Sequence, residues 1–150
     1  MSVSSATLAQ MVRNSASALG KAASELGENF TWRPLDKGRS AHDQILEVAS
    51  IYLMTKHLLE TGELAPMDRG AHGQAMEEFN TPDKALKQLA DAADLLGIAV
   101  EAAPTDRLAK IVSLPFGPGM EKTIAEVVLM AYWNTVYHEG QVNYISTLKA

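Results

Sequence analysis

A stripe of polar residues interrupts an otherwise apolar helical segment near the C-terminal end of the chain. Within residues 122–148, positions three or four apart share one helical face, and that face consists of Val127, Ala131, Asn134, His138, Gln141 and Ile145. Its ends are apolar and its middle is polar. If this face turns toward the core, each of the three polar side chains needs a partner there, because an unpartnered buried polar group costs free energy.

A carboxylate occupies a comparable position on a second segment. Glu47 heads a helical face that continues with Ile51, Met54 and Leu58. A glutamate that points inward at His138 has two interpretations: a buried hydrogen-bonded pair, or part of a metal site, since carboxylate and imidazole both bind divalent metals. A third interpretation leaves the side chains in solvent. The pattern favours the hydrogen-bonded pair, because most buried polar groups are simply satisfied by other protein groups.

Four segments with helical periodicity position these residues: about residues 5–26, 41–60, 82–102 and 122–148. Their boundaries carry ordinary helix signals. Ser40 is a good N-cap for the second segment, with Asp43 three residues later, Pro82 begins the third, and Gly62 follows the second. The fourth segment is the most apolar, and we therefore expect it to be the central helix.

The lengths of these segments predict the fold. Helices of 20–27 residues are about 30–40 Å long, and four helices of similar length favour an all-α four-helix bundle. Residues 61–80 are polar and predict a long, flexible crossover between the second and third helices, with a short helix in it. Residues 105–114 suit a helical turn or a short extended piece, and no segment has a strand pattern long enough for a sheet. The 150 residues suit a single domain, 1–150.

Composition excludes several classes of protein. The chain has no cysteine, which excludes a disulfide scaffold, a thiol nucleophile and a cysteine-ligated zinc site. Its net charge is −5 without a block of Lys or Arg, so we expect no nucleic-acid partner. No apolar run approaches the ~20 residues that cross a bilayer, and the first residues lack the apolar core of a signal peptide. We therefore expect a cytoplasmic protein that does not enter a membrane.

Other chemically interesting side chains have simpler interpretations. His42 follows the N-cap of the second helix, and we expect it to be solvated there. His72 lies in a flexible glycine-rich loop and reaches the site only if that loop folds over it. Trp133, Tyr137 and Tyr144 suit a pocket or a dimer face, but burial in the core is the favoured interpretation, because aromatic side chains dominate cores.

Several short motifs resemble the DinB/YfiT-like superfamily. The sequence Tyr137–His138–Glu139–Gly140–Gln141–Val142 is similar to the closing helix of that family, whose signature is His-x-x-x-His followed by Arg-Gly-Gln and an apolar residue. Thr31–Trp32–Arg33–Pro34 resembles the entry to its second helix, residues 40–49 resemble that helix, and Leu114–Pro115–Phe116–Gly117 resembles the turn before the last helix. The order and spacing of these motifs cover most of residues 30–145.

The resemblance implies a four-helix bundle that is often a homodimer and that in many members binds a divalent metal through three histidines. Those three positions fall on Glu47, Asn134 and His138 in this chain. A zinc, nickel or manganese ion completed by water is the cofactor that it implies, with Asn134 as a weak ligand.

Two functions remain open at this point. The favoured one is a family-like bundle of unassigned reaction with a degenerate metal position. It is a non-catalytic binding or stress-associated protein in which Glu47, Asn134 and His138 only hydrogen-bond, and a small molecule is a candidate ligand. The alternative is a metal-dependent transferase of the thiol S-transferase kind, or a hydrolase, acting on a small molecule.

Overall fold

Helices form most of the computed structural model, which describes residues 3–149. Four long helices lie within these residues: α1 (Ser5–Ser24), α2 (Ala41–Thr61), α4 (Pro82–Ala102) and α6 (Ile124–Leu148). The shorter elements are η1 (Gly27–Thr31), η2 (Pro34–Asp36), α3 (Ala71–Glu78), α5 (Thr105–Ala109), β1 (Ile111–Ser113) and β2 (Glu121–Thr123). The prediction of an all-α chain is confirmed.

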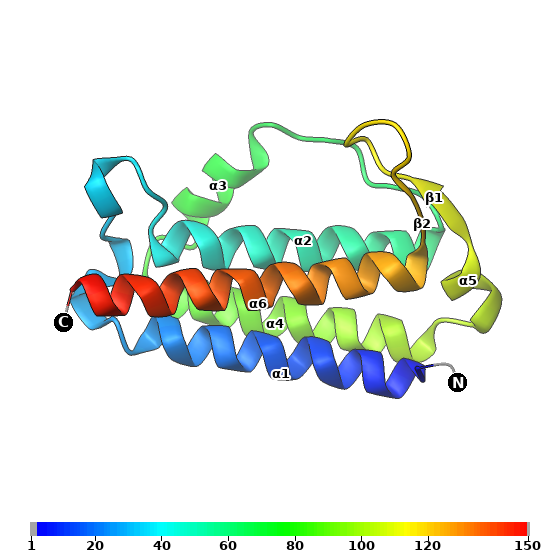
Figure 1. Cartoon of the computed structure of the whole chain (residues 1–150), viewed down its shortest axis with the longest axis horizontal. Helices are drawn as coiled ribbons and strands as arrows, with labels where there is room; N and C mark the ends of the chain where they lie inside the picture. The colour runs from blue at the N-terminus through cyan, green and yellow to red at the C-terminus, as the bar shows by residue number, and fades with distance from the viewer. Residues whose placement is uncertain (1–2, 150) are drawn as a thin grey trace.

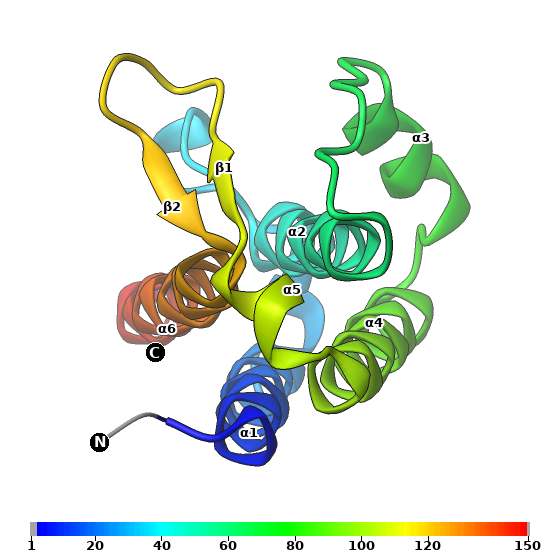
Figure 2. The ribbon, with the colours of Figure 1, turned by 90° about the vertical axis from the view of Figure 1, so that its right-hand side faces the viewer.

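The long helices pack side by side around a shared core (Figure 1). Viewed from the end they form the corners of a diamond, in which α2 and α1 each pack against both α4 and α6 (Figure 2). Apolar side chains from all four helices fill the centre, among them Leu19, Ile45, Leu96 and Val128. Burial of these side chains is the main favourable term in folding. Helices α2 and α6 run antiparallel (Figure 1).

Capping boxes begin the two helices that carry the predicted site. The Ser40 hydroxyl accepts a hydrogen bond from the backbone N–H of Asp43, and the Asp43 carboxylate accepts one from the N–H of Ser40. Thr123 and Glu126 form the same arrangement at the start of α6. Gly62 ends α2 with a φ of +75°, a conformation that favours glycine. The N-cap and the end predicted for this helix are confirmed.

A small hairpin replaces the predicted first turn of the last helix. Strands β1 and β2 pair antiparallel, with Val112 opposite Lys122, and α6 begins only at Ile124. Residues 105–114 contain both of the predicted alternatives, a helical turn in α5 and an extended piece in β1. Strands of three residues are too short to show a strand period, which is why the sequence analysis predicted no sheet.

The crossover between α2 and α4 contains the short helix α3, and it covers a residue predicted to be solvated. His42 is only 5% exposed, and its Nε2 lies 2.7 Å from the backbone oxygen of Phe79. The prediction for His42 was wrong because the crossover folds back over the start of α2. The residues around His42 in the sequence do not indicate this contact with a distant segment. His72 lies 3.5 Å from the Asp43 carboxylate, an interaction with the start of α2.

Helix α6 is not the central helix that its composition predicts. One face is buried, with Val128, Ala131 and Val142 in the core, but the opposite face is exposed. Trp133, Tyr137 and Tyr144 are 51–65% exposed, so the favoured prediction that these rings fill the core was wrong.

Within residues 3–149, no helix combines the length and the apolar character needed to cross a membrane. The cytoplasmic location stays a prediction.

A buried hydrogen bond between Tyr52 and Thr135 joins α2 to α6, with 2.5 Å between the two hydroxyl oxygens. We expect Tyr52→Phe to lower the free energy of unfolding by about 1 kcal/mol, because it removes one buried hydrogen bond and leaves the ring in place. Urea unfolding measures the change. Tyr132→Phe, which changes a partly exposed tyrosine on α6, is the control and should change stability by less than about 0.5 kcal/mol. Equal effects of the two variants would contradict this role for Tyr52.

Candidate functional site

His138 is the most buried polar side chain of the predicted site. It is 3% exposed, and its Nδ1 lies 2.7 Å from Oε1 of Gln44 and 3.0 Å from Oε1 of Gln141. Both neighbours are carbonyl oxygens, which only accept hydrogen bonds. Nδ1 therefore carries the proton that it donates to them, and Nε2 points to the other side of the ring.

The structure brings Glu47 to that other side. Oε1 of Glu47 lies 3.6 Å from Nε2 of His138, which is too long for a hydrogen bond, and the two groups attract each other when both ring nitrogens of His138 carry a proton. The second carboxylate oxygen forms an ion pair with Arg39. The ring of His138 is the largest influence on the pKa of Glu47, and together with Arg39 it outweighs burial and lowers this pKa to about 2. The carboxylate is therefore ionised at neutral pH.

Asn134 lies one turn before His138 on the same face of α6, as the sequence predicts. Its Oδ1 is buried without a hydrogen-bond partner among the described residues, and the same is true of Nε2 of His138. Buried polar atoms without a partner are rare in native proteins. Two of them one helical turn apart indicate a place where something else supplies the missing hydrogen bonds.

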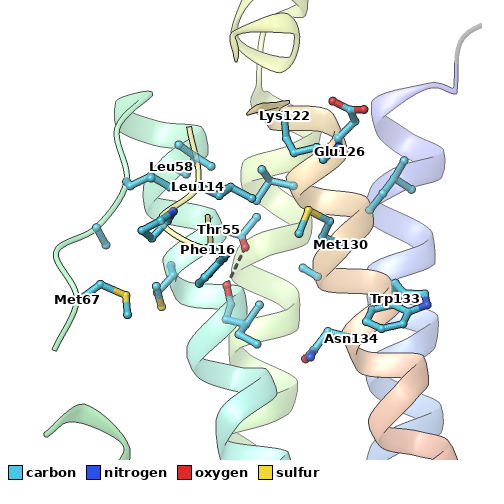
Figure 3. A pocket seen from close by; sticks show the side chains of 18 residues that line it. Thr55, Leu58, Met67, Leu114, Phe116, Lys122, Glu126, Met130, Trp133 and Asn134 are labelled. Atoms are coloured by element: carbon cyan, nitrogen blue, oxygen red, sulfur yellow. Dashed lines mark hydrogen bonds between the residues drawn. The ribbon is translucent and has the colours of Figure 1, made fainter. Parts of the chain in front are cut away.

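A cavity of about 570 Å³ opens between α2 and α6, and Asn134 is one of its lining residues (Figure 3). Its walls come from α2, the crossover after it, the turn before β2 and α6. Most lining side chains are apolar, including Leu58, Met67, Phe116, Met130 and Trp133. This volume lies in the range of cavities that hold small-molecule ligands.

The polar groups of the cavity lie near its two ends. Asn134 points from α6 toward α2 at one end, and Lys122 and Glu126 lie at the other (Figure 3). The hydroxyl of Thr55, between them, donates to the backbone oxygen of Ile51 in its own helix at 2.8 Å. Ile51 lines the cavity and Glu47 lies one turn before it on α2, but neither Glu47 nor His138 is among the lining residues.

The donor set fits a divalent metal poorly. Glu47 and His138 are near enough to share an ion, but Arg39 places a positive charge on the same carboxylate. Asn134 adds only a weak amide ligand. Within residues 3–149 there is no group of three or more His, Asp or Glu side chains arranged to hold a metal. The residues therefore do not reproduce a three-histidine metal centre.

Sequence reasoning missed two residues of this site. Gln44 is 2% exposed and accepts the hydrogen bond of His138; it precedes Glu47 by three residues, which puts both on one helical face. That spacing was the sequence signal that could have identified Gln44 as part of the site. Arg39 lies before the helix, and no periodicity could place it beside Glu47.

Comparison of the sequence with known protein families finds no family that matches this chain. Comparison with curated proteins finds no match either. The DinB/YfiT-like resemblance therefore stays a prediction from the motifs alone.

The low pKa of Glu47 makes a prediction about acid stability. In the unfolded chain this carboxyl titrates near 4.5, and in the folded protein near 2. Its contribution to stability is thus fully present above about pH 4.5 and is lost as pH falls toward 2. We expect the free energy of unfolding of Glu47→Gln to depend less on pH in this window than that of the natural chain.

Urea unfolding at several pH values between 6 and 2.5 measures this difference. Glu78→Gln, which changes an exposed glutamate, is the matched control and should follow the natural chain. A Glu47→Gln variant with the same pH dependence as the natural chain would rule out the pairing of Glu47 with His138 and Arg39.

The poor metal donor set also makes a prediction. Untagged protein incubated with zinc, nickel or manganese and then desalted should retain much less than one ion per chain, measured by elemental analysis. His138→Ala is the control for binding at this position. About one ion per chain, lost in His138→Ala, would overturn the electrostatic argument from Arg39.

Proposed function

We propose that this protein binds an uncharged, mainly apolar small molecule in the cavity between α2 and α6. The observation that carries the proposal is the apolar cavity that ends at Asn134, whose buried Oδ1 has no partner among the described residues. The ligand's body lies against the apolar walls, and a hydrogen-bond donor at its head lies at Oδ1.

The charges around the cavity support an uncharged ligand. Glu47 and Arg39 pair with each other beyond the Asn134 end, and Lys122 and Glu126 have opposite signs at the other end. A charged group in the apolar part would lose its hydration without gaining a partner, which is costly. Burial of an apolar body, in contrast, makes binding more favourable.

The unpartnered atoms support a donor at the ligand's head. Oδ1 of Asn134 accepts hydrogen bonds, and Nε2 of His138 does so when it carries no proton. A hydroxyl or an N–H group would satisfy Oδ1, and leaving this oxygen unpaired costs more than a typical net hydrogen bond contributes. Alcohols, amides and secondary amines with an apolar body are therefore the favoured class.

For the scaffold we propose a DinB/YfiT-like four-helix bundle in which Glu47, Asn134 and His138 occupy the family's metal position as a hydrogen-bonding group. The motif at Tyr137–Val142 and the long crossover before α4 support this. The family resemblance also supports a homodimer. No reaction is assigned to the site.

A metal-dependent transferase or hydrolase is the second candidate. The specific observation in its favour is the free Nε2 of His138 beside a carboxylate. A metal ion at this site would require Arg39 to leave Glu47. The metal content of the protein therefore distinguishes this candidate from the ligand-binding proposal.

Two neutral fluorescent probes test the ligand proposal. N-phenyl-1-naphthylamine has an apolar body and one N–H donor, and 1-benzylnaphthalene has a similar shape without the donor. We expect the natural chain to bind the amine about 2–10-fold more tightly, the value of one net hydrogen bond. In Asn134→Leu this preference should disappear. Fluorescence titration measures all four dissociation constants.

A second pair of variants tests the location. Met54 lines the cavity and is 40% exposed, and Leu95 on α4 is 43% exposed. Met54→Lys should weaken both probes at least about tenfold, because it places a charge against the apolar ligand, whereas Leu95→Lys should leave them unchanged. Probe affinities that Met54→Lys leaves unchanged would contradict the proposed site.

A further inference from the structure

A second hollow lies between the loop that contains η2 and the C-terminal half of α6; Figure 1 shows this loop above the start of α2. Its volume is about 630 Å³, which is in the range of cavities that hold small molecules. The described residues that line it all differ from those that line the α2/α6 cavity. Apolar groups and two aromatic rings form most of its walls, from Pro34, Val136, Tyr137, Tyr144, Ile145 and Leu148.

The polar side chains that line this hollow have hydrogen-bond donors to spare. The amide oxygens of Gln44 and Gln141 already accept from His138, whereas each amide nitrogen carries two hydrogens and uses one. Nε2 of Gln44 donates to the backbone oxygen of Arg39 at 3.4 Å, and Nε2 of Gln141 donates to the hydroxyl of Tyr137 at 3.1 Å. The Tyr137 hydroxyl, which accepts that bond, keeps its own hydrogen to donate. A ligand that faces these groups must therefore supply acceptors.

Arg39 adds a positive charge to the lining of the same hollow. Its guanidinium has five N–H groups, and its ion pair with Glu47 is made through Nη2, so other N–H groups remain for a ligand. Residues 33–39 carry three basic side chains and one acidic one, in a chain whose net charge is −5. Arg33 is paired with Asp43, and the rest of this loop is still positive. The local charge therefore favours an anion.

We infer that this hollow binds a small organic acid, namely a singly charged carboxylate on a flat, apolar body. A carboxylate only accepts hydrogen bonds, and it forms strong, charge-assisted ones with a guanidinium. Its apolar body lies against the rings of Tyr137 and Tyr144. Because Glu47 cancels part of the charge of Arg39, a single negative charge suits the hollow better than the double charge of a phosphate. This site is additional to the uncharged ligand proposed for the α2/α6 cavity.

A glycine within α6 keeps the hollow open. Gly140 lies eight residues before the end of this helix, where glycine is less favourable than every other residue except proline. A Cβ atom at Gly140 would meet no heavy atom of residues 3–149 within 4 Å, so packing inside the chain does not require a glycine. Gly140 is exposed and lines the hollow. A larger side chain there would occupy space that a ligand needs.

The loop that forms the opposite wall is tightly closed. The N–H of Gly38 donates to the backbone oxygen of Pro34 at 2.8 Å, and a Cβ atom at Gly38 would come within 2.9 Å of the same oxygen. Between them, Leu35 and Asp36 have φ values of +54° and +55°, a left-handed conformation that residues other than glycine rarely adopt. Such conformations concentrate at functional sites. The closed loop holds Pro34 and Arg39 beside α6 before a ligand binds.

The two members of the Arg39–Glu47 ion pair should affect the affinity in opposite directions. With 2-naphthoate as the probe, we expect Arg39→Gln to weaken binding at least about tenfold, because it removes a charged hydrogen-bond donor. Glu47→Gln should strengthen binding about three- to tenfold, because it removes a negative charge and frees the guanidinium. Titration followed by NMR measures the dissociation constants. Weaker binding in both variants would show that the pair only supports the fold, and would overturn the inference.

A second pair of variants tests the location without removing any contact. Gly140→Leu should weaken 2-naphthoate at least about tenfold, because its side chain enters the hollow. Gly73→Leu is the matched control: Gly73 also lies in a helix, is exposed, and has open space where a Cβ atom would be added. It lies outside the hollow and should leave the affinity unchanged. Equal affinities of the two variants would overturn the proposed location.

Two further measurements separate this site from the α2/α6 cavity and test the ligand class. Met54→Lys should leave 2-naphthoate binding unchanged, and Gly140→Leu should leave N-phenyl-1-naphthylamine binding unchanged, because each residue lines only one of the two spaces. An effect of Met54→Lys on 2-naphthoate would place the acid in the cavity and overturn the second site. Tighter binding of 2-naphthyl phosphate than of 2-naphthoate would overturn the choice of a carboxylate, and a natural chain that binds no 2-naphthoate would overturn the inference as a whole.

Discussion

Where α2 and α6 meet, buried polar atoms need hydrogen-bond partners, and this need determines how the polar side chains between the two helices are arranged. Nδ1 of His138 is satisfied by Gln44 and Gln141, and Glu47 is held between His138 and Arg39. Nε2 of His138 and Oδ1 of Asn134 are left over. Because the apolar cavity reaches Asn134, the same helices that bury these atoms also provide the space for a molecule that satisfies one of them. The functional proposal depends on this imbalance.

Helix α6 carries different sets of side chains on its inner and outer sides. Its inner side carries the polar group and one wall of the cavity, and its outer side carries the exposed aromatic rings. Trp133 belongs to both, since it lines the cavity and is 65% exposed. Apolar side chains occur on both sides of α6, so its composition does not show which side is buried. This explains why composition alone predicts a central position that α6 does not occupy.

Local patterns predicted the long helices, the Ser40 cap and the shared face of Asn134 and His138, because these depend on residues within a few turns. The same periodicity correctly put Glu47 and His138 on facing sides of two helices. It failed for contacts between segments distant in the sequence. Arg39 reaches Glu47 from outside the helix, Phe79 covers His42 from the crossover, and the exposure of Tyr144 depends on which helices flank α6.

A crystal structure of the protein with N-phenyl-1-naphthylamine would locate the ligand and its hydrogen bond. We expect the probe between α2 and α6, with its nitrogen about 3 Å from Oδ1 of Asn134 and its rings against Met130 and Trp133. A cavity closed by its own side chains, with Oδ1 of Asn134 bonded to another protein group, would contradict it. A probe bound elsewhere on the molecule would do the same.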